Sequence, residues 1–126
     1  MQIERLYKIF LAHPHVQTDT RALAEGQIFF ALKGPNFNGN KFASKALELG
    51  AVAVVVDEET GIIDERIFKV EDALSALQAL ALHHRKQFNI PFIAITGSNG
   101  KTTTKELIHV VLSSTYKTYT TKGNLN

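Results

Sequence analysis

The segment 93–104, which reads IAITGSNGKTTT, allows few local structures. An apolar stretch is followed by two glycines, Gly97 and Gly100, and then by Lys101 and Thr102. This order predicts a strand, a tight glycine turn and a helix that begins at the lysine. The backbone N–H groups of such a turn and helix start can surround phosphate oxygens. The segment therefore predicts a nucleotide phosphate site.

The motif is shorter than the general phosphate-binding pattern G-x-x-x-x-G-K-[ST]. That pattern needs a glycine six positions before the lysine, where this chain has Ile95. The alternative interpretation is an ordinary glycine-rich turn between a strand and a helix. Lys101 favours the phosphate site, because a cation at a helix start otherwise opposes the helix dipole.

Each side chain of the motif predicts a role. Lys101 is expected to contact the outer phosphates as the catalytic residue. The hydroxyl of Thr102 is expected to hold a magnesium ion, the alternative being a simple helix-start hydroxyl. Thr103 is a weaker candidate for phosphate contact. The predicted phosphate-binding set is Gly97, Ser98, Asn99, Gly100, Lys101, Thr102 and Thr103.

Composition excludes several classes of protein. The 126 residues are 44% hydrophobic and 21% charged, typical of a soluble globular protein with one domain or slightly more. A net charge of +2 is too small to favour nucleic acid. The absence of cysteine excludes disulfides and thiolate zinc sites and is consistent with a reducing cytosol. No apolar stretch approaches the ~20 residues that span a bilayer, and the five histidines lack the spacing of a metal site.

The residues before the phosphate motif predict an α/β domain. The run VAVVV at 52–56 is typical of a parallel strand that is buried on both faces. Apolar positions at helical spacing alternate with shorter apolar runs along the rest of this region. The predicted helices cover 3–11, 42–49 and 71–88, and the predicted strands or extended segments cover 16–21, 28–32, 52–56 and 67–70.

A domain boundary is expected near 86–91. After it, 93–121 predicts a strand, a helix over about 101–114 and a second strand, which together form one βαβ unit. One such unit cannot cover its own sheet edges. We therefore expect a complete first domain over 1–88 and, over 89–126, the truncated first βαβ unit of a P-loop ATPase domain.

Several side chains of the first domain allow a structural interpretation. Asp19 and Arg21 are expected to form an ion pair that fixes a loop. Phe37 is expected to pack into the core more readily than to stack on a base. Gly39 is expected to serve a positive-φ turn. The buried faces of the two helices over 42–49 and 71–88 are expected to contain Phe42, Ala43, Ala46, Leu47 and Leu49, and Leu74, Leu77, Leu80 and Ala81.

Four segments, taken in order, resemble the Mur ligases, the ATP-dependent amino-acid-adding enzymes of bacterial cell-wall synthesis. TGSNGKT at 96–102 is similar to their shortened phosphate loop, including the missing first glycine. TDTR at 18–21, GQIFFALKG at 26–34 and ALELGAVAVVV at 46–56 are similar to their uridine-nucleotide-binding N-terminal domain. The resemblance covers essentially the whole chain and implies a cytoplasmic enzyme that uses ATP and Mg²⁺.

The resemblance also implies a substrate site. The residues that would bind the uridine diphosphate end are Thr18, Asp19, Thr20, Arg21, Lys33, Gly34, Asn36 and Phe37, and Asn124 and Asn126 match a segment that approaches the reaction centre. The chain departs from the family pattern at two places. Asn38-Gly39-Asn40 stands where many members have Asp-Gly-His, and Pro35-Asn36 stands where His-Gln is frequent.

Within the family, TKE at 104–106 and TKGNLN at 121–126 are most similar to the members that join D-alanyl-D-alanine to UDP-N-acetylmuramoyl-tripeptide through an acyl phosphate. The implied partners are these two substrates, without nucleic acid or membrane insertion, and the whole enzyme is expected to be a monomer. The 126 residues alone are expected to be inactive. The alternatives are addition of the third amino acid, a P-loop phosphotransferase or GTPase, and a non-catalytic nucleotide-binding module.

Overall fold

The computed structural model describes residues 2–122. The chain divides into two compact units, Met1–Asn89 and Ile90–Asn126. Each unit is described separately below. None of the helices among residues 2–122 is long and apolar enough to cross a membrane.

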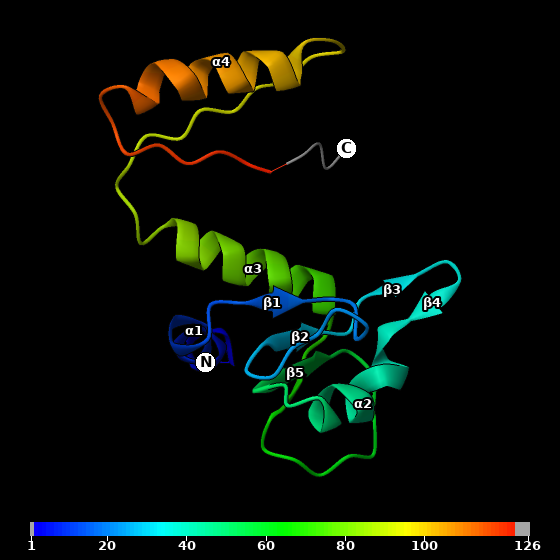
Figure 1. Ribbon diagram of the computed structural model, residues 1–126. Helices are drawn as coiled ribbons and strands as arrows, with labels where there is room; N and C mark the ends of the chain where they lie inside the picture. Colours follow the sequence, from blue (N-terminus) through cyan, green and yellow to red (C-terminus); the bar gives the residue numbers. More distant parts are fainter. Residues whose placement is uncertain (1, 123–126) are drawn as a thin grey trace. The chain divides into compact units, whose positions relative to one another are not determined.

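The first unit is built on a parallel four-stranded sheet (Figure 1). Its strands are β1 (Val16–Gln17), β2 (Ile28–Phe30), β5 (Ala53–Val56) and β6 (Ile67–Lys69), in the order β1-β2-β5-β6. In the register, Phe29 lies beside Val54 and Val55 lies beside Phe68. All four residues of β5 are buried, which confirms the prediction of a strand covered on both faces.

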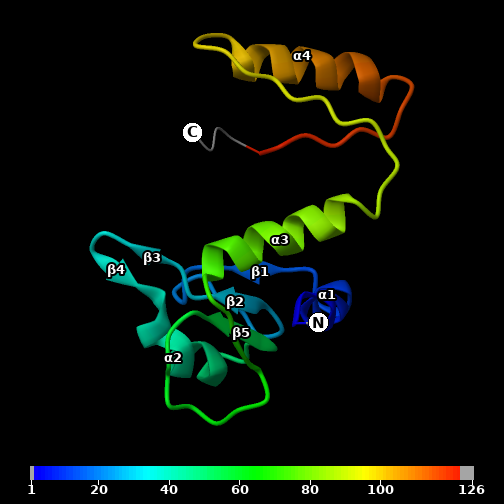
Figure 2. The same cartoon turned by 180° about the vertical axis from the view of Figure 1, so that it is seen from behind.

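Helices cover both faces of this sheet, and the predicted α/β class is therefore confirmed (Figures 1 and 2). Helices α1 (Gln2–Ala12) and α3 (Ala73–Arg85) pack together on one face. The 3₁₀ turn η1 (Gly39–Phe42) leads into α2 (Ala43–Glu48), which packs against β5 on the other face.

The core has two layers because successive strand residues point to opposite faces of the sheet. Phe30 and Val55 pack with Leu80 beneath α1 and α3, and Phe29 and Val54 pack with the alanines of α2. Phe29 and Phe30 are both fully buried. Burial of each such side chain contributes about 1.5–3 kcal/mol, and the largest fully buried side chains all belong to β2 and β5.

The buried face of α3 differs from the prediction. The side chain of Leu74 is 49% exposed, and Ala81 is also exposed. The predictions of Leu77 and Leu80 are confirmed, and Ala73 and Ala76 take the places expected for Leu74 and Ala81. The reason lies at the helix start, where the side chain of Asp72 accepts a hydrogen bond from the backbone N–H of Ser75. This cap fixes the first turn and places Ala73 rather than Leu74 against the core.

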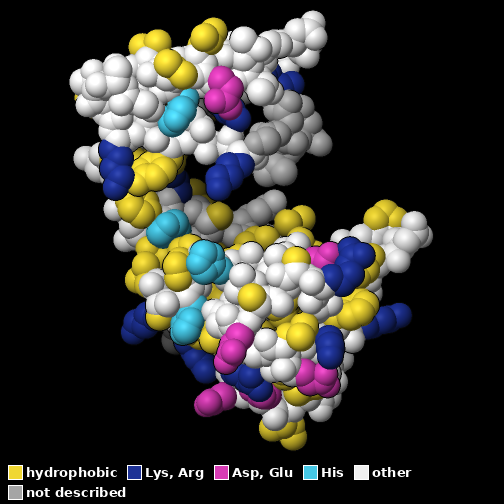
Figure 3. All heavy atoms as spheres, in the orientation of Figure 1, with side chains coloured by type: hydrophobic (Ala, Val, Ile, Leu, Met, Phe, Trp, Pro, Cys, Tyr) yellow, Lys and Arg dark blue, Asp and Glu magenta, His cyan; other side chains and the backbone are white. Residues whose placement is uncertain are grey.

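The second unit has one helix, α4 (Lys101–Ser113), among the residues described, and it begins at the predicted lysine. The strands predicted on either side of it, over 93–96 and 116–121, are not formed. A parallel strand needs a neighbour for its backbone hydrogen bonds, and residues 90–122 contain no other strand to supply it. Hydrophobic side chains of α4, including Leu107 and Val110, are accordingly exposed. Figure 3 shows hydrophobic side chains at the surface of this unit.

Candidate functional site

The carboxyl ends of β1, β2 and β5 lead into three polar segments, 18–21, 33–40 and 57–58. All strands of this sheet are parallel, so these three segments meet at the same edge. Open α/β sheets bind their ligands outside the carboxyl ends of the strands. The first unit therefore presents its candidate binding site here.

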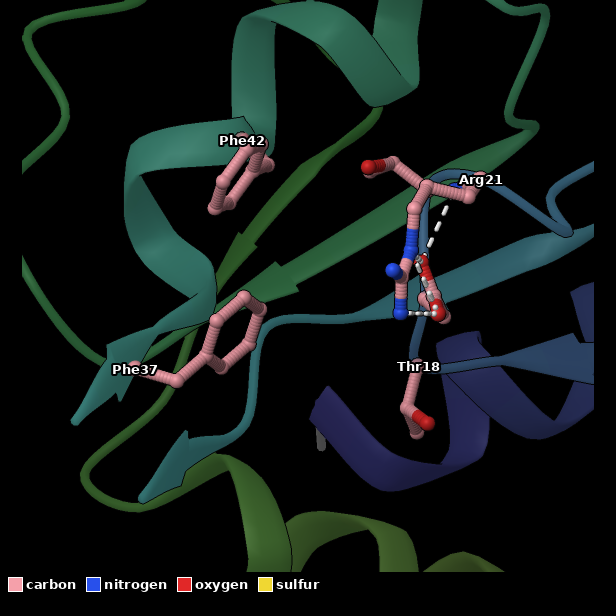
Figure 4. A pocket seen from close by; sticks show the side chains of 6 residues that line it. Thr18, Arg21, Phe37 and Phe42 are labelled. Carbon is pink, nitrogen blue, oxygen red and sulfur yellow. Dashed lines mark hydrogen bonds and ion pairs between the residues drawn. The ribbon is translucent and has the colours of Figure 1, made fainter. Parts of the chain in front are cut away.

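A pocket of about 450 Å³ lies at this edge. It is lined by Thr18, Asp19, Thr20, Arg21, Phe37 and Phe42. Figure 4 shows the rings of Phe37 and Phe42 on one side of the space and the guanidinium of Arg21 on the other. The pocket thus has an aromatic wall and a wall of hydroxyl and charged groups.

The polar wall is held by local hydrogen bonds. The side-chain oxygen of Gln17 accepts from the backbone N–H groups of Thr18 and Asp19, at 2.9 and 3.2 Å. Arg21 donates its backbone N–H and its guanidinium to the carboxylate of Asp19, the shortest contact being 2.7 Å. The predicted ion pair is confirmed. The hydrogen bond from the Arg21 side chain lowers the pKa of Asp19, so the pair stays charged at neutral pH.

Of the two rings in the aromatic wall, Phe37 is among the residues that the family resemblance implies for the substrate site, whereas Phe42 was not predicted for it. Phe37 is 49% exposed and Phe42 is 38% exposed, and their rings stack at a centroid distance of 5.5 Å. The expectation that Phe37 packs into the core is wrong, because Phe37 lies in the hairpin of β3 (Lys33–Gly34) and β4 (Phe37–Asn38), outside the two core layers. Phe42 was expected to face inward. It belongs instead to the 3₁₀ turn, which has three residues per turn. Its side chain therefore does not continue the buried face of the α-helix that follows.

Three of the predicted substrate residues are absent from the pocket lining. Gly34 and Asn36 lie on the hairpin, and both are exposed. The ammonium of Lys33 contacts the carboxylate of Asp57 at 3.1 Å and that of Glu58 at 3.4 Å. The hydrogen bond to Asp57 raises the pKa of Lys33, so this lysine remains a cation at the base of the hairpin.

Asp57 occupies a central position that the sequence did not indicate. Its side chain is only 2% exposed. Burial raises the pKa of the Asp57 carboxyl, but hydrogen bonds from the Asn40 side chain and the Ala73 backbone and the contact with Lys33 outweigh burial, and its pKa lies below the ordinary value. A single acid after a buried strand is common at turns, so nothing in the local sequence marks it.

The segment Asn38-Gly39-Asn40, where the chain departs from the family pattern, takes part in the hydrogen bonds around Asp57. Asn40 is 6% exposed, and its side chain both donates to the Asp57 carboxylate and accepts from the Asp57 backbone N–H. Gly39 does not have the expected positive φ. It is needed instead for close packing, because a Cβ atom there would lie 2.7 Å from the carbonyl carbon of Ala31 and from the backbone oxygen of Leu32.

The phosphate motif forms a separate candidate site in the second unit. Gly97 and Gly100 adopt φ angles of +149° and +75°, which side chains rarely tolerate. Gly100 precedes the first turn of α4, and its carbonyl oxygen accepts a hydrogen bond from the N–H of Thr104. The ammonium of Lys101 folds back over the turn and donates to the carbonyl oxygen of Gly97 at 2.7 Å.

The other predicted residues of this motif are on the surface. Ser98, Asn99, Thr102 and Thr103 are exposed around the start of α4. Among residues 2–122, no group of three His, Cys, Asp or Glu residues is arranged to hold a metal ion. Asn124 and Asn126 lie outside the described residues. The arrangement suits an anion, because the glycine turn, the helix N-terminus and a lysine converge at one place.

Comparison with known proteins gives matches in both units. The model of the Mur ligase family, catalytic domain, matches residues 14–86, and the model of the Mur ligase middle domain matches residues 95–126. The boundary between the two compact units falls between the two matched regions.

Three similar proteins illustrate the likeness. The UDP-N-acetylmuramoyl-tripeptide–D-alanyl-D-alanine ligase of Synechocystis sp. is 46% identical over 114 residues, covering 89% of this chain and 25% of that protein. The crystal structure of a MurF ligase from Thermotoga maritima in complex with ADP gives a TM-score of 0.80 at 35% identity, covering 89% of this chain and 26% of that one. A UDP-N-acetylmuramoyl-L-alanyl-D-glutamate–2,6-diaminopimelate ligase of Geobacter sulfurreducens is 39% identical over 99 residues, covering 75% of this chain and 19% of that protein. The chain spans about a quarter of the length of the first two relatives.

Proposed function

The chain belongs to the Mur ligase family, and on that premise we propose that the whole protein uses ATP to join D-alanyl-D-alanine to UDP-N-acetylmuramoyl-tripeptide. A carboxylate does not react with an amine at neutral pH. Transfer of the γ-phosphoryl group of ATP to the tripeptide carboxylate gives an acyl phosphate and ADP. The amine of the dipeptide then attacks the acyl carbon, an amide forms, and inorganic phosphate leaves.

In this proposal the second unit binds the phosphates of ATP. The positive φ angles of Gly97 and Gly100 give the loop the conformation in which its N–H groups can face an anion. Lys101 would exchange the Gly97 carbonyl for the outer phosphates and neutralise their charge. The seven predicted phosphate-binding residues, from Gly97 to Thr103, all lie in this turn and the first turn of α4.

The donor chemistry at the start of α4 also fits a magnesium ion. Mg²⁺ prefers oxygen ligands and shares them with substrate phosphates and water, so one protein hydroxyl is sufficient. Thr102, the second residue of α4, would provide that hydroxyl. Bound there, the ion would add positive charge beside the transferred phosphoryl group.

The first unit would bind the uridine diphosphate end of the substrate in the pocket of 18–21, Phe37 and Phe42. The stacked rings offer a flat surface to a base, and Thr18, Thr20 and Arg21 offer donors to ribose and phosphate oxygens. Lys33, Gly34 and Asn36 would contribute from the adjoining hairpin. Because this end is remote from the reacting carboxylate, binding here would orient the reacting end.

The observation that carries the proposal is the aromatic and polar pocket at the carboxyl edge of the sheet, in the same chain as the glycine–lysine loop. The proposal implies a cytoplasmic enzyme, because ATP and nucleotide-linked precursors are its substrates. In NMR titrations of the chain, we expect UDP to shift signals of residues 18–21, 37 and 42, and ATP with Mg²⁺ to shift those of 97–103. Shifts confined to other residues would contradict the assigned sites.

The reaction itself is tested with the whole protein. We expect ADP release that requires both UDP-N-acetylmuramoyl-tripeptide and D-alanyl-D-alanine. The similarity to the Geobacter diaminopimelate ligase makes addition of the third residue the second candidate. Turnover of the dipeptide precursor with a free amino acid, without turnover of the tripeptide precursor, would establish that alternative and overturn the first.

A further inference from the structure

The carboxylate of Asp57 joins three segments of the first unit that are far apart in sequence. Asn40 in η1 donates to its Oδ1 at 2.7 Å, and the ammonium of Lys33 in β3 lies 3.1 Å from the same oxygen. The backbone N–H of Ala73, the first residue of α3, donates to Oδ2 at 3.2 Å. A side chain that follows the buried strand β5 thus contacts both the hairpin and a helix of the opposite layer.

Neighbouring side chains extend this network along the hairpin. Asn38 in β4 donates to Glu58 at 3.0 Å and accepts from both the backbone and the side chain of Asn40 at 3.0 Å. Lys33 also reaches Glu58, at 3.4 Å. Both strands of the hairpin are therefore attached to residues 57 and 58 at the end of β5.

The hairpin is too short to define its own position. Its two strands contain two residues each, and an isolated two-stranded hairpin is marginally stable in water. Yet Phe37 on this hairpin must lie across from Arg21 for the pocket to have two walls (Figure 4). The stacking of Phe37 on Phe42 also depends on the hydrogen bonds to Asp57. Asn40, which donates to Asp57, belongs to the same 3₁₀ turn as Phe42.

We propose that Asp57 is a positioning residue for the substrate nucleotide. By holding Asn40 and Lys33, it fixes the hairpin and the aromatic wall opposite the segment 18–21. Asp57 itself does not line the pocket and acts through the residues it holds. This inference rests on the proposed function of that pocket as the site of the uridine diphosphate end.

The test is calorimetric titration of the 126-residue chain with UDP, which separates the dissociation constant from the amount of competent protein. We expect Asp57→Asn to raise the dissociation constant about tenfold with unchanged stoichiometry, because it removes a charged acceptor from the network. If Asp57 only stabilised the fold, Asp57→Asn would reduce the fraction of folded protein. The stoichiometry would then fall, while the dissociation constant for UDP stayed unchanged.

Asp64→Asn is the matched control. Like Asp57, Asp64 is a carboxylate paired with a cation, here Arg66 at 2.7 Å, but it precedes β6 and therefore lies at the opposite, amino edge of the sheet. We expect the dissociation constant of the Asp64→Asn variant for UDP to stay within about twofold of the parent value. An equal effect of both variants would overturn the role of Asp57.

Asn38→Ala is a milder second variant that keeps Asp57 and tests the same network if Asp57→Asn does not fold. We expect a dissociation constant about threefold to fivefold above the parent value, with weaker cross-peaks between the rings of Phe37 and Phe42 in NMR spectra. Parent-like affinity in the folded variants overturns the inference about Asp57. Absence of UDP binding by the parent chain overturns the proposed function instead.

Discussion

The ammonium of Lys101 donates a hydrogen bond to the carbonyl oxygen of Gly97 at 2.7 Å, across the turn that precedes α4. The two residues are four positions apart, and the turn brings them together because Gly97 and Gly100 both adopt positive φ angles. The lysine therefore already lies over the loop whose N–H groups are proposed to receive phosphates. A bound nucleotide would replace the carbonyl with phosphate oxygens as the partner of this cation.

Replacing Lys101 by methionine should weaken ATP binding at least thirtyfold, by about 2 kcal/mol, because hydrogen bonds between charged groups contribute about 1.5–3 kcal/mol. The measurement is titration of the chain with ATP and Mg²⁺. Lys117→Met, at an exposed lysine of the same unit, is the control and should bind as the parent does. Equal ATP affinities of Lys101→Met and the parent would contradict the proposed role.

Replacing Phe42 by alanine should weaken UDP binding about tenfold with little loss of stability. Stacking of a base on an aromatic ring contributes about 1–3 kcal/mol, whereas the ring of Phe42 is already 38% exposed. Phe88→Ala is a matched control, because Phe88 is 45% exposed and contacts His84 rather than the pocket. The prediction fails if both variants change the dissociation constant for UDP equally.

Replacing Gly39 by alanine should lower the free energy of unfolding of the first unit by about 1–3 kcal/mol. The added Cβ would lie 2.7 Å from backbone atoms of Ala31 and Leu32, which cannot move aside as a flexible side chain does. Urea unfolding followed by circular dichroism measures the change. At Gly34 a Cβ would meet no atom within 4 Å, so Gly34→Ala should be neutral within about 0.5 kcal/mol.

Acid should destabilise the first unit through Asp64. Hydrogen bonds from the side chain and backbone of Arg66 lower the pKa of Asp64 from 3.8 to about 2. Well above pH 3.8 the Asp64 carboxylate is ionised in both the folded and the unfolded chain, and its full contribution to stability is present. Between pH 3.8 and about 2 the unfolded chain takes up the proton first, so stability falls.

The pH series is read against Asp64→Asn, which should lose less stability over this interval than the parent. Urea midpoints at pH 5, 4, 3 and 2 make the comparison. Asp57 also has a lowered pKa and stays in both proteins, so the variant should retain part of the acid sensitivity. Superimposable pH profiles of the two proteins would exclude a contribution from Asp64.

The helices and most strands of the first unit were predictable because their signals are local. The buried strand at 52–56 is marked by its own composition, and the ion pair of Asp19 and Arg21 joins residues only two positions apart. The start of α4 at Lys101 follows from the glycine turn before it. In each case the residues that create the feature are neighbours in the chain.

The strands flanking α4 illustrate the limit of local signals. The apolar sequence at 93–96 has strand propensity, but a strand forms only when another strand accepts its hydrogen bonds. Residues 90–122 contain no such partner, and the segment remains without regular structure. Propensity therefore predicted a strand where pairing was missing.

The sequence by itself determined the parallel α/β sheet, the glycine–lysine turn and the polar loop at 18–21, because short-range periodicity and backbone preference suffice for these. Only the tertiary structure decided that Phe42 joins Phe37 in the pocket wall, that Gly39 is needed for close packing, and that Asp57 holds Asn40 and Lys33. Asn40 and Asp57 are 17 positions apart and meet because the connection through α2 returns the chain to the same edge of the sheet. Such a contact depends on how the layers pack, which no short stretch of sequence contains.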